Sequence, residues 1–233
     1  MNLPDFKLLS VIIPVYNEET TISEVIEKVS AVKLPINKEI IVVDDGSTDG
    51  TLDYLNNSKD KIARVYLTPV NIGKGAAVRI GLTLARGEII LIQDADLELD
   101  PNEYELLLEP ILEGRASVVY GSRFLSRNKV SPIRRTANYF LTKTTNILFR
   151  TRLTDMETAY KVFTAEVAES LRLRANRFEI EPEITAQIAR NGFVITEVPI
   201  TYRPRTQSEG KKIKWKDGVK ALWTLLKYRF LKP

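Results

Sequence analysis

The feature that most constrains the fold of this chain is a set of short apolar segments that each end in polar residues. The segments are apolar throughout, which is typical of parallel strands covered on both faces of a sheet. Four of them occupy the first half of the chain: Ser10–Val15, Glu39–Asp44, Ala63–Leu67 and Glu88–Gln93. Helical segments separate them. The sequence therefore predicts an α/β fold, with a Rossmann-like, mostly parallel sheet and helices on both faces.

The helices are predicted from start signals and apolar periodicity. Residues 21–24 (Thr-Ile-Ser-Glu) form a capping-box pattern, which predicts a helix opened by Thr21. In the second half we expect helices at 133–149, 182–191 and 216–231, and a strand at 193–200. We find no linker or repeat. One domain is expected at residues 1–202, and a basic loop and amphipathic C-terminal helix at 203–233 are expected to belong to it.

Cysteine and histidine are both absent from the chain. Without cysteine there is no disulfide framework, thiolate metal site or cysteine nucleophile. Without histidine the chain cannot be a hydrolase of the Ser-His-Asp type. Acid–base or metal chemistry must therefore rest on Asp, Glu, Lys, Arg, Tyr or a bound ion.

Two carboxylates follow the fourth apolar segment, at Asp94 and Asp96. In an extended segment this spacing places both side chains on the same side, where they repel unless a cation lies between them. Mg²⁺ or Mn²⁺ would fill that role, because hard cations take oxygen ligands and share them with substrate phosphates. Glu98 falls on the same side if the chain stays extended. The alternative is a solvated acidic turn or the cap of a helix near Pro101.

Other polar residues end the first two strands, at 14–18 and 44–47, and should meet residues 93–98 at one rim of the sheet. A glycine-rich turn at 71–77 leads into a helix. This turn either presents backbone N–H groups to a phosphate or packs its helix tightly on the sheet. It lacks the Gly-Lys-Ser/Thr pattern of a P-loop.

Basic charge is concentrated in two blocks. Residues 123–152 carry eight Lys/Arg and no acid, and residues 203–233 carry ten Lys/Arg and two acids, while the whole chain has a net charge of +4. Two basic blocks on an acidic body favour an anionic partner over two solvated surfaces. A nucleic-acid partner is not expected, because the aromatic residues do not interleave with the charges as stacking platforms.

Together these segments resemble the family 2, GT-A-fold glycosyltransferases, in the branch of dolichol-phosphate mannose synthase and bacterial polyprenyl-phosphate glycosyltransferases. The resemblance is carried by SVIIPVYNEE at 10–19, VVDDGSTDGT at 42–51, NIGKGAAVRIG at 71–81, DADLELDP at 94–101, GSRF at 121–124 and the segment 198–212. It implies an inverting hexosyltransferase that depends on Mg²⁺ or Mn²⁺. The donor would be of the GDP-mannose or UDP-glucose type, and the acceptor a polyprenyl or dolichyl phosphate.

The resemblance also implies roles for individual residues. The donor nucleotide and diphosphate would be bound by Pro14, Tyr16, Glu18, Asp45, Ala77, Asp94 and Ala95, the metal by Asp94, Asp96 and Glu98, and the sugar and acceptor phosphate by Arg123, Arg135, Arg205 and Lys211, with Asp96 also catalytic. Relatives often carry Gln or Ser at the position of Glu98, which leaves its ligand role open. The segment 155–161 departs from the related pattern at Glu157 and Thr158, so the choice of sugar is expected to differ.

Two other functions compete with a lipid-phosphate acceptor. One is transfer to a glycan hydroxyl in polysaccharide assembly, which would need a general base from Asp155, Glu157, Glu179 or Glu181. The other is a non-catalytic receiver-like or nucleotide-sensing module, because an acidic pair at 44–45 ends a strand. The added pair at 94–96 and the basic tail argue against that module. A lipid phosphate is already anionic and needs no strong base.

The C-terminal helix is expected to dock on a membrane surface. An apolar stripe recurs at spacings of three or four, in Trp215, Val219, Leu222, Trp223, Leu226 and Phe230, with lysines around it. Such a stripe suits the lipid interface, or else packs on the domain itself or on a partner subunit. The longest apolar run, 8–16, is far shorter than the roughly 20 residues that span a bilayer. We therefore expect a peripheral protein on the cytoplasmic face, without a signal peptide or transmembrane segment. A homo-oligomer or a separate membrane-anchoring subunit stays open.

Overall fold

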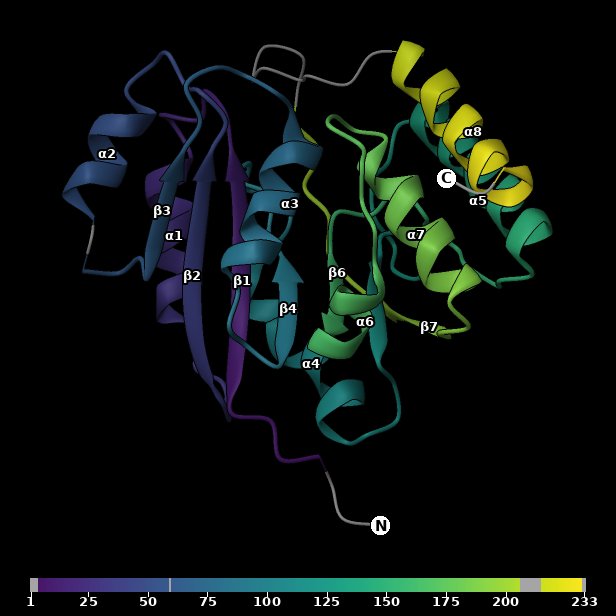
Figure 1. Ribbon diagram of the computed structural model, residues 1–233, viewed down its shortest axis with the longest axis horizontal. Coiled ribbons are helices and arrows are strands. Elements are labelled where there is room, and N and C mark those ends of the chain that lie inside the picture. Colours follow the sequence, from purple (N-terminus) through teal and green to yellow (C-terminus); the bar gives the residue numbers. More distant parts are fainter. Residues whose placement is uncertain (1–3, 59, 206–214, 232–233) are drawn as a thin grey trace.

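The computed structural model describes residues 4–58, 60–205 and 215–231, with side chains from 217 in the last range. The described strands form one seven-stranded sheet in the order β3-β2-β1-β4-β6-β5-β7 (Figure 1). Their bounds are β1 Leu8–Val15, β2 Asn37–Asp44, β3 Arg64–Leu67, β4 Ile89–Ile92, β5 Val118–Ser122, β6 Lys161–Thr164 and β7 Ile195–Pro199. Only β6 runs antiparallel to its neighbours among these strands. The predicted mostly parallel sheet is confirmed.

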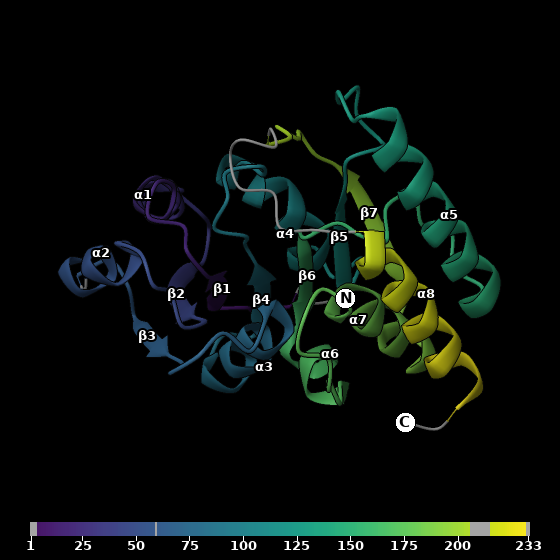
Figure 2. The ribbon, with the colours of Figure 1, turned by 90° about the horizontal axis from the view of Figure 1, so that it is seen from above.

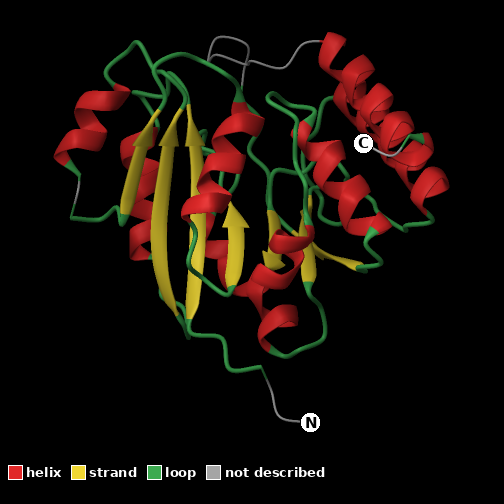
Figure 3. Cartoon of the chain, in the orientation of Figure 1, coloured by secondary structure: helices red, strands yellow, loops and turns green. Residues whose placement is uncertain are grey.

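Helices cover both faces of the sheet (Figures 1 and 3). One face carries α3 (Lys74–Leu84), α6 (Ala165–Ser170) and α7 (Ile180–Arg190), and the other carries α1 (Ile22–Ala31) and α4 (Tyr104–Leu112), which follows the short 3-10 helix η1 (Pro101–Glu103). The helix α2 (Thr51–Asn57) lies beyond the β3 edge. At the opposite end, α5 (Pro132–Phe149) and α8 (Trp215–Phe230) lie side by side and pack on α7 (Figure 2). The predicted C-terminal helix is thus present.

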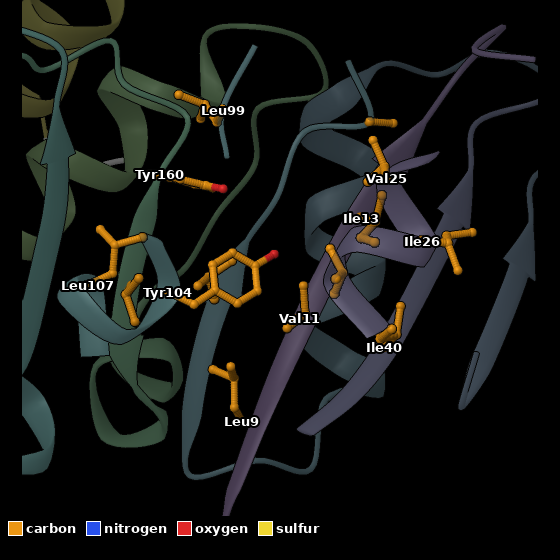
Figure 4. Close-up of a cluster of buried hydrophobic side chains, with 14 of the residues drawn as sticks. Leu9, Val11, Ile13, Val25, Ile26, Ile40, Leu99, Tyr104, Leu107 and Tyr160 are labelled. Atoms are coloured by element: carbon orange, nitrogen blue, oxygen red, sulfur yellow. The ribbon is translucent and has the colours of Figure 1, made fainter. Parts of the chain in front are cut away.

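The main core lies between the sheet and the α1/α4 face (Figure 4). Leu9, Val11 and Ile13 of β1 point toward this layer and are fully buried, as period-two alternation in a strand requires. The rings of Tyr104 and Tyr160 meet edge to face, with their centroids 6.0 Å apart. Both hydroxyls donate to Gln93 Oε1, at 2.8 and 2.7 Å. A polar residue at the end of β4 is therefore anchored by two aromatic residues.

The reversed strand β6 decides which segments reach the functional rim. Ile92, the last residue of β4, pairs with Lys161, the first residue of β6. Because the two strands run in opposite directions, residues 155–160 continue past the carboxyl end of β4. The carboxyl ends of β1, β2, β4, β5 and β7 lie at this same rim, since these strands are parallel.

The capping-box prediction is half right. The helix begins at Ile22 as predicted, but the Thr21 side chain makes no cap hydrogen bond. Its hydroxyl donates instead to the carbonyl oxygen of Ala95, 2.7 Å away, and to the carboxylate of Glu18. A buried carbonyl from a distant loop thus takes the hydroxyl that the local pattern assigned to the helix. No helix in the described ranges is long and apolar enough to cross a membrane.

Candidate functional site

The carboxyl end of β4 carries the predicted acidic pair. Asp94 is held by Lys74, the first residue of α3, whose Nζ lies 2.6 Å from Asp94 Oδ1. The same ammonium lies 2.8 Å from Glu181 Oε1 of α7. Burial disfavours the charged amine, but the two carboxylates outweigh it and raise the pKa of Lys74. Asp94 therefore has an internal cation as its partner.

Asp96 has a different environment. Burial, and then the negative charges of Asp94 and Glu98, raise the pKa of Asp96 to about 7. Its Oδ1 accepts from the backbone N–H of Glu98, and the intervening Leu97 has a positive φ of 58°. Arg205 is the nearest compensating charge, and its Nε donates to the Asp96 carbonyl oxygen at 2.9 Å. The acidic turn is thus closed by a residue that follows β7.

Glu98 is used to hold the segment after β7. Its Oε1 accepts from the backbone N–H of Arg205 at 2.8 Å, and its Oε2 accepts from the Tyr202 hydroxyl at 3.1 Å. The Arg205 guanidinium in turn binds Glu18 at the end of β1, with Nη2 2.6 Å from Oε2. The predicted donor residue Glu18 and the predicted acceptor residue Arg205 therefore form one ion pair. This pair ties β1, β4 and β7 together at the rim.

Some of the carboxylates at this rim are suitable ligands for a divalent cation. Asp94 and Asp96 are close enough for one charge to raise the pKa of the other, and a metal shared with a diphosphate would relieve that repulsion. Among the residues that the structure describes, however, no three Asp or Glu side chains are grouped to hold a metal. Both oxygens of Glu98 already accept hydrogen bonds. The predicted three-ligand cluster is therefore not assembled, and two carboxylates fit the metal.

Asp45, at the end of β2, binds the glycine-rich turn. Its carboxylate accepts from the backbone N–H groups of Ile72 and Gly73, at 2.9 and 2.7 Å. Burial raises the pKa of Asp45. Gly73 has a φ of 126° that other residues rarely adopt, and an added Cβ would lie 2.4 Å from the Asn176 carbonyl oxygen. The N–H groups of Ile72 and Gly73 are thus paired within the chain, and the expectation that other N–H groups of the turn meet a phosphate stays a prediction.

Several predicted donor residues lie in the core. Ala77 is fully buried and packs α3 against Ile41 and Val43 of β2, so it has no exposed surface that could contact a donor. Pro14 and Ala95 are also buried, whereas Tyr16 and Asp94 are half-buried at the rim. The prediction that Ala77 lines the pocket is corrected, because a small residue there serves close helix–sheet packing.

Arg123 follows β5 and is held in place by Asp155. Its Nε and Nη2 each lie 2.7 Å from an oxygen of this carboxylate, and its backbone N–H donates to the same group. The guanidinium also lies 5.2 Å from the ring centroid of Tyr202. Such a bidentate, buried pair fixes the guanidinium plane.

Arg135 lies on the exposed side of α5 and shares a ring contact with Arg123, whose guanidinium lies 5.9 Å from the centroid of Phe124. Its guanidinium lies over the ring of Phe124, 5.7 Å from the centroid. It borders an open groove of about 640 Å³ that continues along α5 to Leu153, past Tyr139 and Asn138. Asn138 is only 7% exposed, and neither its Oδ1 nor its Nδ2 has a hydrogen-bond partner among the residues that the structure describes. The predicted basic residue Lys211 falls outside the described residues.

A buried chain of charges links the acidic pair to the loop before β6. Lys161 is fully buried, and its Nζ donates to Glu181 and to the carbonyl oxygens of Met156 and Thr158. Glu181 in turn binds Lys74, and through it Asp94. Neither lysine was predicted from the sequence to take part in the site. The available signal was a lysine at the start of an otherwise apolar strand.

The outer faces of α5 and α8 expose large apolar side chains. Ala221, Leu225 and Tyr228 of α8 are buried against the domain. Of the predicted apolar stripe, Val219, Trp223 and Phe230 are 58%, 62% and 72% exposed, whereas Leu222 is partly buried against the domain. On α5 the exposed residues are Ile133, Tyr139, Phe140 and Ile147. The C-terminal helix therefore packs on its own domain and still presents an apolar stripe outward.

Comparison with known proteins gives these residues a family. Residues 10–175 match the family model described as Glycosyl transferase family 2. This match spans the acidic pair, the glycine-rich turn and the Arg123–Asp155 pair. The chain belongs to glycosyl transferase family 2.

Relatives and solved structures agree with the family and the fold. The chain is 29% identical to an undecaprenyl-phosphate 4-deoxy-4-formamido-L-arabinose transferase of Aeromonas hydrophila, over 91% of this chain and 64% of that protein. It is 28% identical to a dolichyl-phosphate beta-glucosyltransferase of Trichomonas vaginalis, over 94% of this chain and 72% of that one. A glucosyl-3-phosphoglycerate synthase of Mycobacterium tuberculosis, crystallised with Mn²⁺, UDP and phosphoglyceric acid, matches with a TM-score of 0.77 at 22% identity, over 97% of this chain and 80% of that one. This last likeness confirms the predicted GT-A-type fold.

Proposed function

We propose that the protein transfers a hexose from a nucleotide diphosphate donor to a polyprenyl phosphate, at the surface of a membrane. The groove along α5 is the observation that supports a polyprenyl phosphate as the acceptor. An exposed arginine, Arg135, stands at a groove whose further lining includes Tyr139, Ile147 and Leu153. A polyprenyl phosphate matches this lining, because its phosphate could bind the arginine and its tail could contact the apolar side chains. The names of the two relatives, which both specify a polyprenyl or dolichyl phosphate, support the same acceptor.

The reaction is a displacement at the anomeric carbon of the donor sugar. An oxygen of the acceptor phosphate forms the new bond to that carbon, and the bond to the nucleoside diphosphate breaks, which leaves its negative charge at the rim. Arg123, fixed by Asp155, and Arg205, fixed by Glu18, would stabilise this charge together with Lys74, which lies beside Asp94. Preorganised cations of this kind stabilise developing charge without reorganisation. The acceptor enters as an anion, so the step needs no general base.

Asp94 and Asp96 would hold Mg²⁺ or Mn²⁺ together with the donor diphosphate. When bound, the metal would supply a Lewis acid for the departing diphosphate. Lys74 already neutralises Asp94 in the protein alone. Asp96, whose pKa is raised to about 7, is the carboxylate that gains most from a nearby cation.

Transfer to a glycan hydroxyl is the second candidate, and one observation favours it. Such a reaction needs a general base with a pKa near the working pH. Burial, and then the charge of Glu181, raise the pKa of Glu157 to about 7. The two candidates share the donor site and differ in whether an acceptor phosphate is required.

Substitution in the groove tests the acceptor. Arg135→Ala should raise the KM for a short polyprenyl phosphate at least tenfold and leave hydrolysis of the donor within twofold of the wild type. Arg115→Ala is the control, because Arg115 pairs only with Glu113 on the surface among the described residues. An unchanged KM for the lipid phosphate in Arg135→Ala would show that the acceptor does not bind in this groove.

A further inference from the structure

Glu157 lies in a loop that the fold fixes at the same rim as the acidic pair. Two residues before it, Asp155 holds Arg123 at the end of β5. One residue after it, the Thr158 hydroxyl donates to the carbonyl oxygen of Gly121 at 2.6 Å. Lys161, four residues on, pairs with the last residue of β4. The backbone around Glu157 is therefore rigidly placed between the ends of β4 and β5.

Buried charges connect this loop to Asp94. Lys161 binds the carbonyl oxygens on both sides of Glu157, those of Met156 and Thr158, and also binds Glu181. Glu181 binds Lys74, which binds Asp94. One chain of buried ion pairs therefore joins Asp94 to the loop that carries Glu157, at the rim where a donor sugar would lie.

Glu157 differs from Asp155 and Glu181 because its buried oxygen is unpaired. Asp155 is paired with Arg123, and Glu181 with two lysines. The Oε1 atom of Glu157 is buried and accepts no hydrogen bond from any described residue. Native proteins leave few such atoms, since each costs the desolvation of a polar group. A ligand that brings O–H donors would satisfy it.

We propose that Glu157 accepts hydrogen bonds from hydroxyl groups of the transferred sugar and makes the enzyme select neutral sugars over uronates. This inference rests on the proposed function, because it needs a sugar donor at the rim. A sugar carboxylate beside the buried oxygen of Glu157 would bring acceptor atoms where that oxygen needs a donor. The cations that could receive it are already engaged, Arg123 by Asp155 and Lys161 by Glu181. Like charges placed together in a buried site disfavour binding.

Matched donor pairs test the selection. UDP-glucose is compared with UDP-glucuronate, and GDP-mannose with GDP-mannuronate, because each pair differs only in oxidation at one carbon. Binding is measured by calorimetry in Mn²⁺, with UDP and GDP alone as references. The wild type should bind the neutral member of the accepted pair at least tenfold more tightly than the uronate.

Three variants assign the selection to Glu157. Glu157→Gln should reduce the preference for the neutral donor over the uronate to threefold or less, chiefly by improving uronate binding. Glu157→Asp should keep most of that preference. Glu103→Gln is the matched control, because Glu103 also has a buried unpaired oxygen and a pKa raised chiefly by burial, but lies on η1. Thermal melting of each variant confirms that it is folded.

The possible results distinguish a failure of the role of Glu157 from a failure of the proposed function. Equal binding of both members by the wild type, or an unchanged ratio in Glu157→Gln, would overturn the role of Glu157 while leaving a sugar transferase. Loss of turnover in Glu157→Gln, with donor binding and ratio unchanged, would make the residue a general base instead. A protein that binds neither UDP nor GDP, with or without a sugar, would overturn the proposed function as well.

Discussion

Replacing Lys74 by methionine should destabilise the protein far more than an ordinary surface lysine would. The Lys74 side chain is 14% exposed and lies between two carboxylates, of which Glu181 is only 7% exposed. Methionine keeps the length of the side chain and removes the charge. Removing one partner of a fully buried ion pair costs about 3–5 kcal/mol.

The structure allows a closer estimate. The two lysines, Lys161 before Lys74, overcome burial and lower the pKa of Glu181 from 4.5 to about 2. That shift corresponds to roughly 3 kcal/mol of stabilisation of the ionised form, of which the smaller part belongs to Lys74. Asp94 loses its partner too, but it is 24% exposed and is partly rehydrated. We therefore expect Lys74→Met to lower the free energy of unfolding by about 2–3 kcal/mol.

Urea unfolding at several pH values is the assay. A carboxylate whose folded pKa is lowered contributes stability above its unfolded pKa, and this contribution is lost as the pH falls through the folded value. The difference between the wild type and Lys74→Met should therefore be full at pH 7 and shrink below about pH 4.5. Lys28→Met is the control, because Lys28 pairs with Glu24 on an exposed helix face. It should cost about 0.5 kcal/mol or less. Equal losses in the two variants would refute the buried charge chain.

The remaining predictions concern the metal, pH and the membrane. Asp96→Asn should abolish transfer and weaken the Mn²⁺-dependent rise in melting temperature given by UDP or GDP, and a variant with normal turnover in Mn²⁺ would refute the assignment. Because the pKa of Glu157 is raised to about 7, wild-type stability should fall as pH rises from about 4.5 through 7, by about 3 kcal/mol at the limit, whereas Glu157→Gln should lack this component. Equal pH dependence of the free energy of unfolding in the wild type and Glu157→Gln, measured by urea unfolding, would contradict this prediction. Trp223→Ser with Phe230→Ser should reduce flotation with anionic liposomes at low salt relative to the wild type, and unchanged flotation would exclude this stripe as the docking face.

Strand patterns in the sequence were sufficient to predict the sheet and the rim. Continuous apolar runs identify buried parallel strands, and the parallel arrangement forces their polar ends together. The pair Asp94 and Asp96 was found in this way, because two carboxylates after a buried strand are informative by position. The family resemblance then extended the prediction to Arg123 and Arg205, which the structure brings to the same rim.

What the sequence could not supply is the pairing of charges across distant elements. The apolar strand that begins at Lys161 indicates its burial, but nothing local indicates that it pairs with Glu181 or that Glu98 has both oxygens occupied by groups that follow β7. Asp45 shows the same limit, because its pattern fits a ligand contact while its carboxylate closes a turn 27 residues away. Thr21 was assigned to its own helix and instead bonds a carbonyl 74 residues distant. These contacts depend on the packing of the whole domain.

The most direct test of the lipid-phosphate acceptor compares transfer from one donor to three acceptors. Transfer of radiolabelled sugar from the accepted UDP- or GDP-sugar in Mn²⁺ is measured to a polyprenyl phosphate, to the matching polyprenol and to a soluble glycan. We expect product with the polyprenyl phosphate alone, since the phosphate is the attacking anion and no general base is needed. Comparable product with the glycan, and none with the polyprenyl phosphate, would contradict this expectation.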